Sequence, residues 1–332
     1  MKVILAEPRG FCAGVERAVT IVERALEVFG PPVYVRHEIV HNKRVVDDLR
    51  EKGAVFVEEL DEIPDGGVTI FSAHGVSEKV EDIAKKRKLP VIDATCPLVA
   101  KVHIEAGRYE NEGKEIVLIG HQGHPEVEGT SGRVKNGVHI VATPEDVAKL
   151  EVSDPDKVAY VTQTTLSVDD TREVIEALKE RYPNISGPDV KDICYATQNR
   201  QASVRLLAGE VDMILVVGAK NSSNSNRLRD LGEEMGVPTH LINDARDVDP
   251  AWFKNMERIG ITAGASAPEQ LVQKVVGRIR ELGTVELCIQ DGITEKVRFK
   301  LPPELVKDGE DGRTPRRDET YGGDTQPMSN TQ

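Results

Sequence analysis

The stretch from residue 1 to residue 32 reads MKVILAEPRGFCAGVERAVTIVERALEVFGPP, and it contains the unit from which the fold is built. Its first ten residues carry a short apolar run, which predicts a buried strand and is too short for the apolar region of a signal peptide. A loop with Cys12 follows, and apolar residues then recur at helical spacing from Val15 to Phe29. Gly30-Pro31-Pro32 ends this predicted helix, because proline cannot continue one.

The same order of strand, polar loop and helix recurs along the chain. Short Val- and Ile-rich runs predict further strands at 68–71, 115–120, 158–161, 213–218 and 258–263. The helices that follow include predicted segments over 77–88 and 226–235. Strands that alternate with helices predict parallel sheets built from βαβ units. Ligands of such sheets bind beyond the carboxyl ends of the strands, where all five polar loops lie.

Three cysteines divide the chain into segments of near-equal length. Cys12, Cys96 and Cys194 each precede a predicted helix, with Pro97 suited to a first helical position and Thr197 to a cap. A helix N-terminus lowers the pKa of a nearby thiol and so favours the thiolate that binds metal. No residue-level repeat is evident, but the spacing predicts three related α/β modules around one centre.

The predicted boundaries follow the cysteines. We expect a first module with an N-terminal strand, two further modules, a C-terminal strand segment and a disordered tail. Their ranges are 13–96 with the strand at 2–6, 97–193, 194–283, 284–306 and 307–332. The tail is predicted because its composition is polar, contains Gly and Pro, and is almost without aliphatic residues.

Composition excludes several classes of protein. The chain has 332 residues, more than one core usually organises, and its net charge of -13 argues against a nucleic-acid or anionic-membrane surface. No apolar run approaches the roughly 20 residues that span a membrane. We therefore expect a soluble cytoplasmic protein whose four cysteines are free, metal-bound or catalytic rather than paired in disulfides.

The cysteine contexts favour a metal centre over buried structural thiols. Cys12 and Cys96 stand in loop-like sequence, whereas Cys288, in VELCIQ, has the context of a core strand residue. The spacing matches neither the CxxC pairs of zinc ribbons nor the cysteine run of ferredoxins. If the three thiolates converge, one iron of a cubane cluster lacks a cysteine ligand. Such an iron is a Lewis acid that can bind a substrate oxygen.

Histidines supply a second set of candidates. His41, His74 and His124 are predicted to bind a ligand, and two of them end strand–loop units. A lone histidine is more often structural, so it is the position of two of these histidines at the ends of strand–loop units that favours a functional role. The spacing of His121, His124 and Glu126 also suggests zinc, but the intervening Gly and Pro preclude the helical geometry of zinc proteases.

Small polar side chains are concentrated in the loop Asn221-Ser222-Ser223-Asn224-Ser225-Asn226. Such residues cap helices, and together with helix N-terminal N–H groups they also bind phosphate. Ser266 repeats the arrangement in the next unit. Neutral donors and imidazoles would let an acidic protein bind a diphosphate. Glu126 is a candidate acid and Thr164 a candidate hydroxyl relay, although each signal is weak by itself.

Together these segments resemble the LytB-type family of 4-hydroxy-3-methylbut-2-enyl diphosphate reductases. The resemblance covers residues 9–269 in order. It rests on RGFCAGVERA, EIVHN, SAHGVS, DATCPLV, GHQGHPEVEGT, TQTTLSVDDT, NSSNSNRL and ITAGASAPE. No motif position departs from the family pattern, whereas Cys288 and the tail fall outside it.

The resemblance implies three α/β modules in a pseudo-threefold trefoil around a [4Fe–4S] cluster with one open iron. It implies that Cys12, Cys96 and Cys194 bind the cluster and that Glu126 donates a proton, with Thr164 and Thr165 near the substrate hydroxyl. The implied diphosphate-binding residues are His41, His74, His124, Ser222, Ser223, Asn224 and Ser266.

In this family two electrons from reduced ferredoxin or flavodoxin remove an allylic hydroxyl. The products are isopentenyl and dimethylallyl diphosphate, in the last step of the non-mevalonate isoprenoid pathway. Two other hypotheses stay open on the residues alone. One is a hydro-lyase whose open-iron cluster acts only as a Lewis acid, and the other is a non-catalytic cluster-transfer protein, which would not need the phosphate-type loops.

Overall fold

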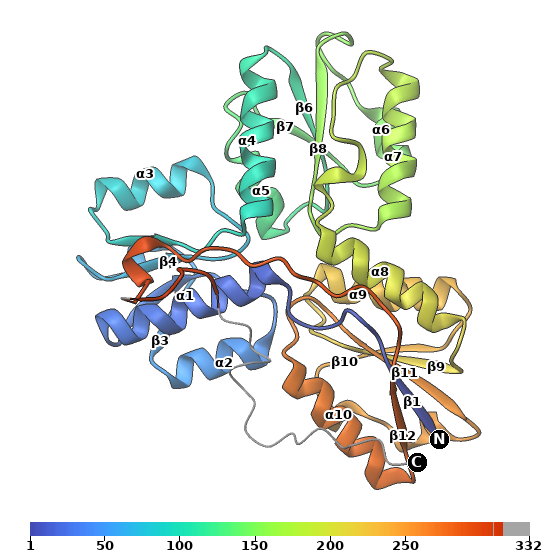
Figure 1. Cartoon of the computed structure of the whole chain (residues 1–332). Coiled ribbons are helices and arrows are strands. Elements are labelled where there is room, and N and C mark those ends of the chain that lie inside the picture. Colours follow the sequence, from blue (N-terminus) through green and yellow to red (C-terminus); the bar gives the residue numbers. More distant parts are fainter. Residues whose placement is uncertain (308, 315–332) are drawn as a thin grey trace.

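The chain folds into three α/β modules that meet at a common centre (Figure 1). The computed structural model describes residues 1–307 and 309–314. Each module contains one parallel sheet, of five, four and three strands. The predicted fold class, a trefoil of three α/β modules, is confirmed.

The first module contains a four-stranded sheet in the order β3-β2-β4-β5. Its strands are β2 (Val33–Arg36), β3 (Ala54–Val57), β4 (Thr69–Phe71) and β5 (Val91–Asp93). Its helices are α1 (Ala13–Phe29), α2 (Lys43–Glu51) and α3 (Glu78–Lys86). The apolar face of α1 packs on the sheet, where Ile21 and Val22 are fully buried. The predicted strand at 68–71 and helix over 77–88 therefore correspond to β4 and α3.

The second module has the strand order β7-β6-β8 and projects away from the other two. Its strands are β6 (Glu115–Ile119), β7 (Val138–Val141) and β8 (Val158–Thr162). Its helices are α4 (Pro97–Asn111), α5 (Pro125–Ser131), α6 (Pro144–Lys149) and α7 (Val168–Arg181). Strands β6 and β8 have fully buried centres, because helices cover the sheet.

The third module combines the N-terminal strand with strands from residues 213–289, in the order β10-β9-β11-β1-β12. Its strands are β1 (Lys2–Leu5), β9 (Met213–Val217), β10 (Thr239–Ile242), β11 (Arg258–Ala263) and β12 (Glu286–Ile289). Its helices are α8 (Tyr195–Ala208), α9 (Ser223–Glu234) and α10 (Glu269–Leu282). The prediction that strand 2–6 accompanies the first module is wrong, because β1 pairs with β11 and β12. Pairing depends on distant segments that local sequence does not specify.

Two local predictions also need correction. Helix α9 begins at Ser223 rather than at residue 226, because the Ser222 side chain caps it by accepting the Ser225 N–H. Cys288 lies in a strand as predicted, but it is not in the core. Strand β12 is at the edge of the sheet and pairs only with β1, which leaves Cys288 partly exposed.

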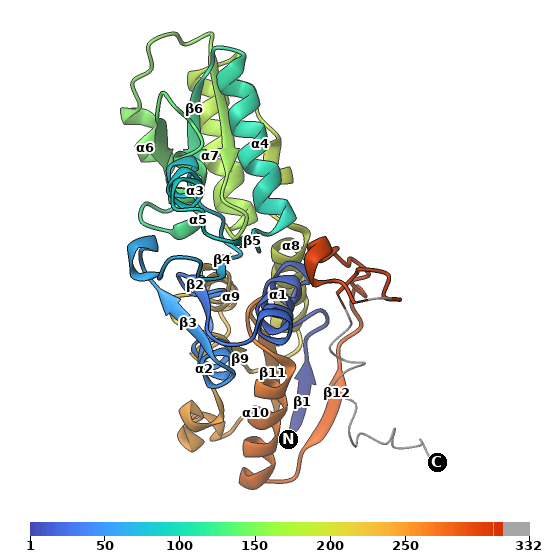
Figure 2. The ribbon, with the colours of Figure 1, turned by 90° about the vertical axis from the view of Figure 1, so that its left-hand side faces the viewer.

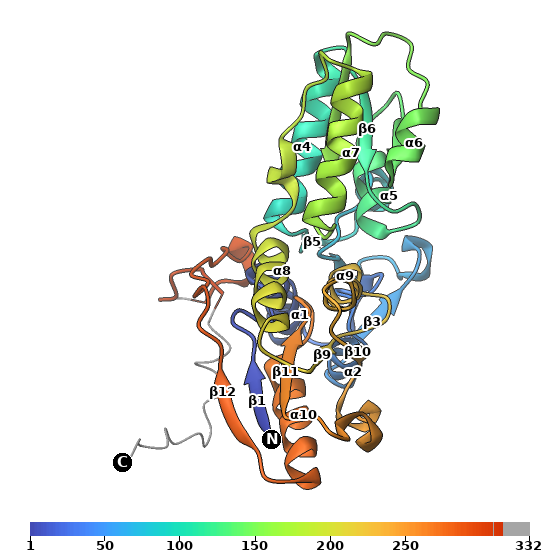
Figure 3. The same cartoon turned by 90° about the vertical axis from the view of Figure 1, so that its right-hand side faces the viewer.

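After β12 the chain crosses back to the first module as the C-terminal segment, residues 290–307 (Figures 2 and 3). It runs beside α8 and α1, and its Leu301 and Leu305 are buried in the core of the first module. The predicted disordered tail lies mainly in 308 and 315–332, outside the described residues. Within the part that is described, Thr314 donates its N–H to the Phe299 carbonyl.

No helix among the described residues is long and apolar enough to cross a membrane.

The buried core of the protein is divided among the three modules. Leu207 of α8 packs under the third sheet so closely that a Cβ added at Gly260 would lie 2.7 Å from its side chain. The preceding residue, Leu206, has a relative exposure of 57%.

We expect Leu207→Ala to lower the free energy of unfolding by about 2–5 kcal/mol, because it removes buried methyl groups and leaves a cavity. Leu206→Ala is the matched control, and its change should stay within about 0.5 kcal/mol. Chemical denaturation followed by circular dichroism measures both. Equal losses in the two variants would contradict the packing of α8 described above.

Candidate functional site

Each of the three predicted cysteines is the N-cap of a helix that starts at the centre of the molecule. The Cys12 Sγ accepts the Val15 N–H at 3.5 Å, and the Cys194 Sγ accepts the Thr197 N–H at 3.4 Å. Cys96 precedes α4, with proline at the first helical position. Cys194, rather than the predicted Thr197, therefore caps α8. The helix N-termini direct partial positive charge toward all three sulfurs.

The sulfurs of Cys12 and Cys96 both lie close to Gly14. A Cβ added at Gly14 would lie 2.6 Å from the Cys96 Sγ and 3.8 Å from the Cys12 Sγ, so only glycine leaves room here. Burial, followed by the nearby Cys12 and Cys194, raises the pKa of the Cys96 thiol to about 12. Burial and the nearby Cys12 raise the pKa of the Cys194 thiol to about 11. Without metal these thiols are protonated, so a metal must displace their protons.

This donor set fits an iron–sulfur cluster. No group of three His, Cys, Asp or Glu side chains closes on one metal ion anywhere in residues 1–307 and 309–314. A cubane cluster binds each thiolate through a different iron, so its ligands surround a volume rather than a point. Three sulfurs at three buried helix N-termini match that requirement.

The three predicted histidines form one cluster. The ring centroids of His41 and His74 lie 4.2 Å apart in a stacked arrangement, and those of His74 and His124 lie 5.9 Å apart. Burial lowers the pKa of His124 to about 4 and holds that of His74 well below its usual range. Both imidazoles are therefore neutral at pH 7, and each has one N–H to donate.

The polar residues at the start of α9 and in the loop between β11 and α10 border the histidine cluster. Ser266 donates its hydroxyl to the His41 carbonyl at 2.9 Å, and Ser223 donates to the Thr165 carbonyl at 3.3 Å. Asn224 accepts the Ala265 N–H through Oδ1. Among the described residues, its Nδ2 and the His41 Nε2 are buried without a hydrogen-bond partner. Buried polar atoms rarely remain unpaired, so this pair of atoms offers hydrogen-bonding positions to a polar ligand.

Glu126 and Thr164 form the acid–hydroxyl pair that the sequence suggested. Thr164 donates its N–H to Glu126 Oε1 at 2.7 Å and its hydroxyl to Oε2 at 3.0 Å. Burial raises the pKa of Glu126 to about 7, against the lowering effect of both hydrogen bonds. The carboxyl can therefore carry a proton near neutral pH and release it. The Glu126 backbone N–H donates to the His124 Nδ1 at 3.2 Å, so His124 caps the helix on which Glu126 lies.

Sequence reasoning missed the residues that orient these groups. Glu38 Oε2 lies 3.3 Å from His41 Nδ1 and accepts the Asn221 amide N–H at 2.9 Å. Ser72 Oγ lies 3.3 Å from His74 Nδ1. Glu38 and Ser72 flank the histidines by only two or three positions, which is the one signal that could have indicated them.

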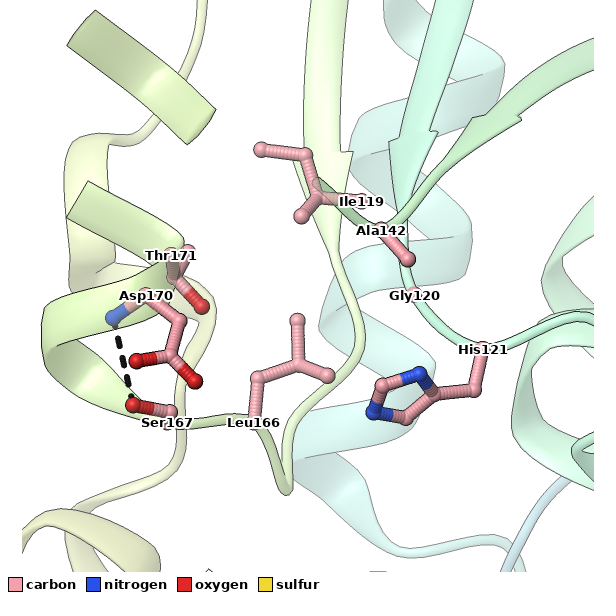
Figure 4. A pocket seen from close by; sticks show the side chains of 8 residues that line it. All are labelled: Ile119, Gly120, His121, Ala142, Leu166, Ser167, Asp170 and Thr171. Carbon is pink, nitrogen blue, oxygen red and sulfur yellow. Dashed lines mark hydrogen bonds between the residues drawn. The ribbon is translucent and has the colours of Figure 1, made fainter. Parts of the chain in front are cut away.

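A separate small cavity lies at the carboxyl ends of β6 and β8 (Figure 4). His121, Leu166 and Asp170 are among its lining residues, and Ser167 Oγ accepts the Asp170 N–H. None of the predicted site residues lines it. It lies beside the candidate site but does not belong to it.

The fold and the site define a three-module α/β protein in which buried helix-capping thiols adjoin a pocket of neutral hydrogen-bond donors. The chain belongs to the LytB family, whose model, described as LytB protein, matches residues 3–280. The family inferred from the sequence motifs is thereby confirmed.

Relatives cover almost the whole chain. This chain is 62% identical over 304 residues to the 4-hydroxy-3-methylbut-2-enyl diphosphate reductase of Azoarcus sp. strain BH72. The match covers 92% of this chain and 97% of the relative. It is 60% identical over 308 residues to the protein of the same name in Idiomarina loihiensis, which covers 92% and 98%.

Two solved structures are also similar. The E-1-hydroxy-2-methyl-but-2-enyl-4-diphosphate reductase from Plasmodium falciparum has a TM-score of 0.87 and 41% identity, over 91% of this chain and 96% of that one. A second structure, of the (E)-4-hydroxy-3-methyl-but-2-enyl diphosphate reductase described as the terminal enzyme of the non-mevalonate pathway, has a TM-score of 0.62 and 37% identity. It covers 84% of this chain and 99% of its own.

The Glu126–Thr164 contact predicts a measurable pKa change. Thr164→Val removes a hydroxyl that stabilises the carboxylate, so the pKa of Glu126 should rise by about one unit, the equivalent of one hydrogen bond to a charged group. Infrared titration of the carboxyl band, assigned by its loss in Glu126→Gln, measures this shift. Thr165→Val is the control, since its hydroxyl pairs with Gln163. An unchanged or lower pKa in Thr164→Val would refute the contact.

Proposed function

We propose that this protein is a 4-hydroxy-3-methylbut-2-enyl diphosphate reductase of the cytoplasm. The overall change takes one allylic C–OH group, two electrons and two protons to a C–H group and water. The observation that carries the proposal is the buried Glu126 carboxyl, which accepts both the N–H and the hydroxyl of Thr164, while the Thr164 carbonyl accepts the Cys194 N–H. The names of the relatives from Azoarcus and Idiomarina support the same substrate.

Cys12, Cys96 and Cys194 would hold the [4Fe–4S] cluster, since each caps a helix and the Cys12 and Cys96 sulfurs both lie close to Gly14. When bound, the cluster supplies electrons one at a time from reduced ferredoxin or flavodoxin, and its iron without a cysteine ligand supplies a Lewis acid. Cys288 is outside this set, because it lies on the edge strand β12.

The diphosphate would occupy the pocket between the histidine cluster and the α9 N-terminus. The unpaired Asn224 Nδ2 is a donor that this ligand would satisfy, and the unpaired His41 Nε2 would donate to it when the ring also keeps the Nδ1 proton that faces Glu38. His74, His124, Ser222, Ser223 and Ser266 complete the proposed pocket. The α9 N-terminus adds partial positive charge, so a chain of net charge -13 can bind an anion without a lysine cluster.

Glu126 would provide the proton for the leaving hydroxyl. Its pKa of about 7 keeps the proton available, and Thr164 fixes the direction of the carboxyl. Thr165 would lie near the substrate hydroxyl. Glu126 has a relative exposure of 2%, so bulk water does not compete for the proton. The carbon that receives the proton of the new C–H bond decides whether the product is isopentenyl or dimethylallyl diphosphate.

Anaerobic purification with iron analysis, followed by assay with and without a chemical reductant, tests the proposal. We expect about four irons per chain by the cubane stoichiometry and turnover that requires the reductant. Turnover without reductant would instead support a hydro-lyase. Iron without turnover would support a cluster-transfer protein, and a protein without iron would refute the cluster.

Replacing the acid should separate binding from turnover. We expect Glu126→Gln to keep its iron and its affinity for the diphosphate but to lose about 10²–10⁴-fold in turnover, the usual contribution of a general acid. In the wild type, turnover should fall as the pH rises above about 7, because Glu126 loses its proton there. Turnover near the wild-type value in Glu126→Gln would remove Glu126 from this role.

Replacing a pocket donor should weaken binding alone. Asn224→Asp keeps the acceptor for Ala265 N–H but replaces the free donor with a charged acceptor. We expect it to lose at least about tenfold in affinity for inorganic pyrophosphate, the equivalent of one charge-assisted hydrogen bond, by calorimetry. Asn136→Asp adds the same charge on the exposed surface of the second module and should bind as the wild type does. Equal weakening in both would show only a general charge effect.

A further inference from the structure

A basic residue follows each of the three helix-capping cysteines at nearly the same distance. Arg17 lies five residues after Cys12, Lys101 five after Cys96, and Arg200 six after Cys194. In each case the cation lies on the helix that the cysteine caps. Each also reaches a segment that leads into a different cysteine.

Arg17 connects α1 to the segment before Cys96. Its Nη1 donates to the Thr95 carbonyl at 3.0 Å, and its Nη2 donates to the Asp93 carbonyl at 3.5 Å. Thr95 precedes Cys96 directly, so Arg17 determines how far that cysteine lies from the helix capped by Cys12.

Lys101 connects α4 to the segment before Cys194. Its Nζ lies 3.0 Å from Asp192 Oδ1, and the Asp192 side chain is fully buried. Asp192 Oδ2 also accepts the Thr162 N–H at the end of β8. The carboxylate thereby fixes the approach to Cys194 from two sides.

Arg200 connects α8 to the segment before Cys12, and it is the most buried of the three cations, with no exposed surface. Its Nε and Nη2 donate to the Gly10 carbonyl at 3.0 and 2.6 Å, and Nη2 also reaches the Phe11 carbonyl at 3.2 Å. Phe11 precedes Cys12 directly. The third link therefore returns to the first cysteine and closes a ring.

We propose that Arg17, Lys101 and Arg200 are positioning residues, each of which fixes the spacing of one pair of cluster cysteines. The inference rests on the cluster assigned under the proposed function. Arg17 fixes the pair Cys12–Cys96, Lys101 the pair Cys96–Cys194, and Arg200 the pair Cys194–Cys12. A triangle is defined by the lengths of its three sides. Three cations that each fix the distance between two cysteines therefore fix the relative positions of all three sulfurs.

The C-terminal segment (residues 290–307) reinforces two of the three links. Arg17 Nε donates to the Lys300 carbonyl at 2.7 Å, and Glu295 Oε1 lies 3.0 Å from Arg200 Nη1. Glu295 also accepts the Asn199 amide N–H at 3.0 Å. The segment thus restricts the guanidinium groups from outside. None of the hydrogen bonds or ion pairs that Lys101 makes among the described residues comes from this segment, and the Lys101 side chain is 49% exposed. We therefore expect the Lys101 link to be the weakest.

The ring also has an electrostatic consequence. Each thiolate of a bound cluster would add negative charge at a buried place. Each of the three cations lies within one or two helical turns of the cysteine that caps its helix. The N-termini of these helices also direct partial positive charge toward the cysteines. Buried charge requires such compensation, so the ring would stabilise the deprotonated, metal-binding state of the site.

The metal-free full-length protein allows each pair to be measured separately. In a Cys288→Ser background, Cys194→Ser leaves Cys12 and Cys96, Cys12→Ser leaves Cys96 and Cys194, and Cys96→Ser leaves Cys12 and Cys194. Dibromobimane becomes strongly fluorescent when it bridges two neighbouring thiols, so its rate of fluorescence gain reports how often each pair lies in reach.

We expect a selective pattern. Arg17→Met should slow bridging of Cys12 and Cys96 by about tenfold, the loss expected for hydrogen bonds from a charged donor, and leave Cys12–Cys194 within about twofold. Arg200→Met should slow bridging of Cys12 and Cys194 by about tenfold and leave Cys12–Cys96 within about twofold. Lys101→Met should slow only Cys96–Cys194, by about threefold, because exposed pairs contribute less.

Matched controls lie further along the same helices. Arg24 of α1, Arg108 of α4 and Arg205 of α8 pair with carboxylates that are not next to a cysteine. Their methionine variants should bridge all pairs at the wild-type rate. Slowing of every pair by every variant would show general loosening and would overturn the ring, as would an absence of slowing in all three test variants. If Arg200→Met does not fold by circular dichroism, Arg17→Met and Lys101→Met still decide between these outcomes.

Iron content separates this inference from the proposed function. After anaerobic reconstitution, Arg17→Met and Arg200→Met should release iron to a chelator at least about tenfold faster than the control variants. A wild-type protein that binds no iron would refute the cluster, whatever the bridging rates. A wild type that binds iron, with test variants that retain it as firmly as the controls, would overturn the ring and leave the cluster assignment intact.

Discussion

The convergence of three cysteine-capped helices on one buried point is the constraint on which the rest of the structure depends. Each of α1, α4 and α8 belongs to a different module, so the modules can meet only where their first turns meet. Gly14 leaves the space that the Cys96 sulfur occupies. The N-terminal strand β1 pairs with β11 of the third sheet, and Arg200 of α8 donates to the Gly10 carbonyl, so the segment before Cys12 lies against the helix that follows Cys194.

Burial at this centre determines the chemistry of the neighbouring groups. Loss of solvent raises the pKa of Glu126 to about 7 and lowers that of His124 to about 4, so a carboxyl that can carry a proton and a neutral imidazole lie two residues apart at the start of α5. The His41 Nε2 and the Asn224 Nδ2, which are buried without a hydrogen-bond partner among the described residues, are the atoms that the proposed diphosphate would contact.

The cations beside the cysteines complete this arrangement and explain why an acidic protein can place three thiols together. Arg200 has all its donors occupied by carbonyls and by Glu295, which offsets the cost of burying a guanidinium. The C-terminal segment contributes that carboxylate and packs Leu301 in the first module. The segment thus connects the third module to the first on the side of the cysteine loops. There it restricts the guanidinium groups of Arg17 and Arg200.

The sequence by itself determined the local elements and the family. Strand 258–263 was predicted with its observed bounds, because apolar runs between polar loops have a short-range cause, and eight motifs in order indicated the cysteines, the histidines and Glu126. Only the tertiary structure decided that β1 belongs to the third sheet, that Cys288 is at an edge, and that Glu38 and Ser72 orient histidines. It also showed that Arg17, Lys101 and Arg200, whose spacing after the cysteines is visible in the sequence, each contact the segment before another cysteine. The reason is that strand pairing, burial and side-chain direction depend on segments that lie far apart in the chain and meet only in the folded protein.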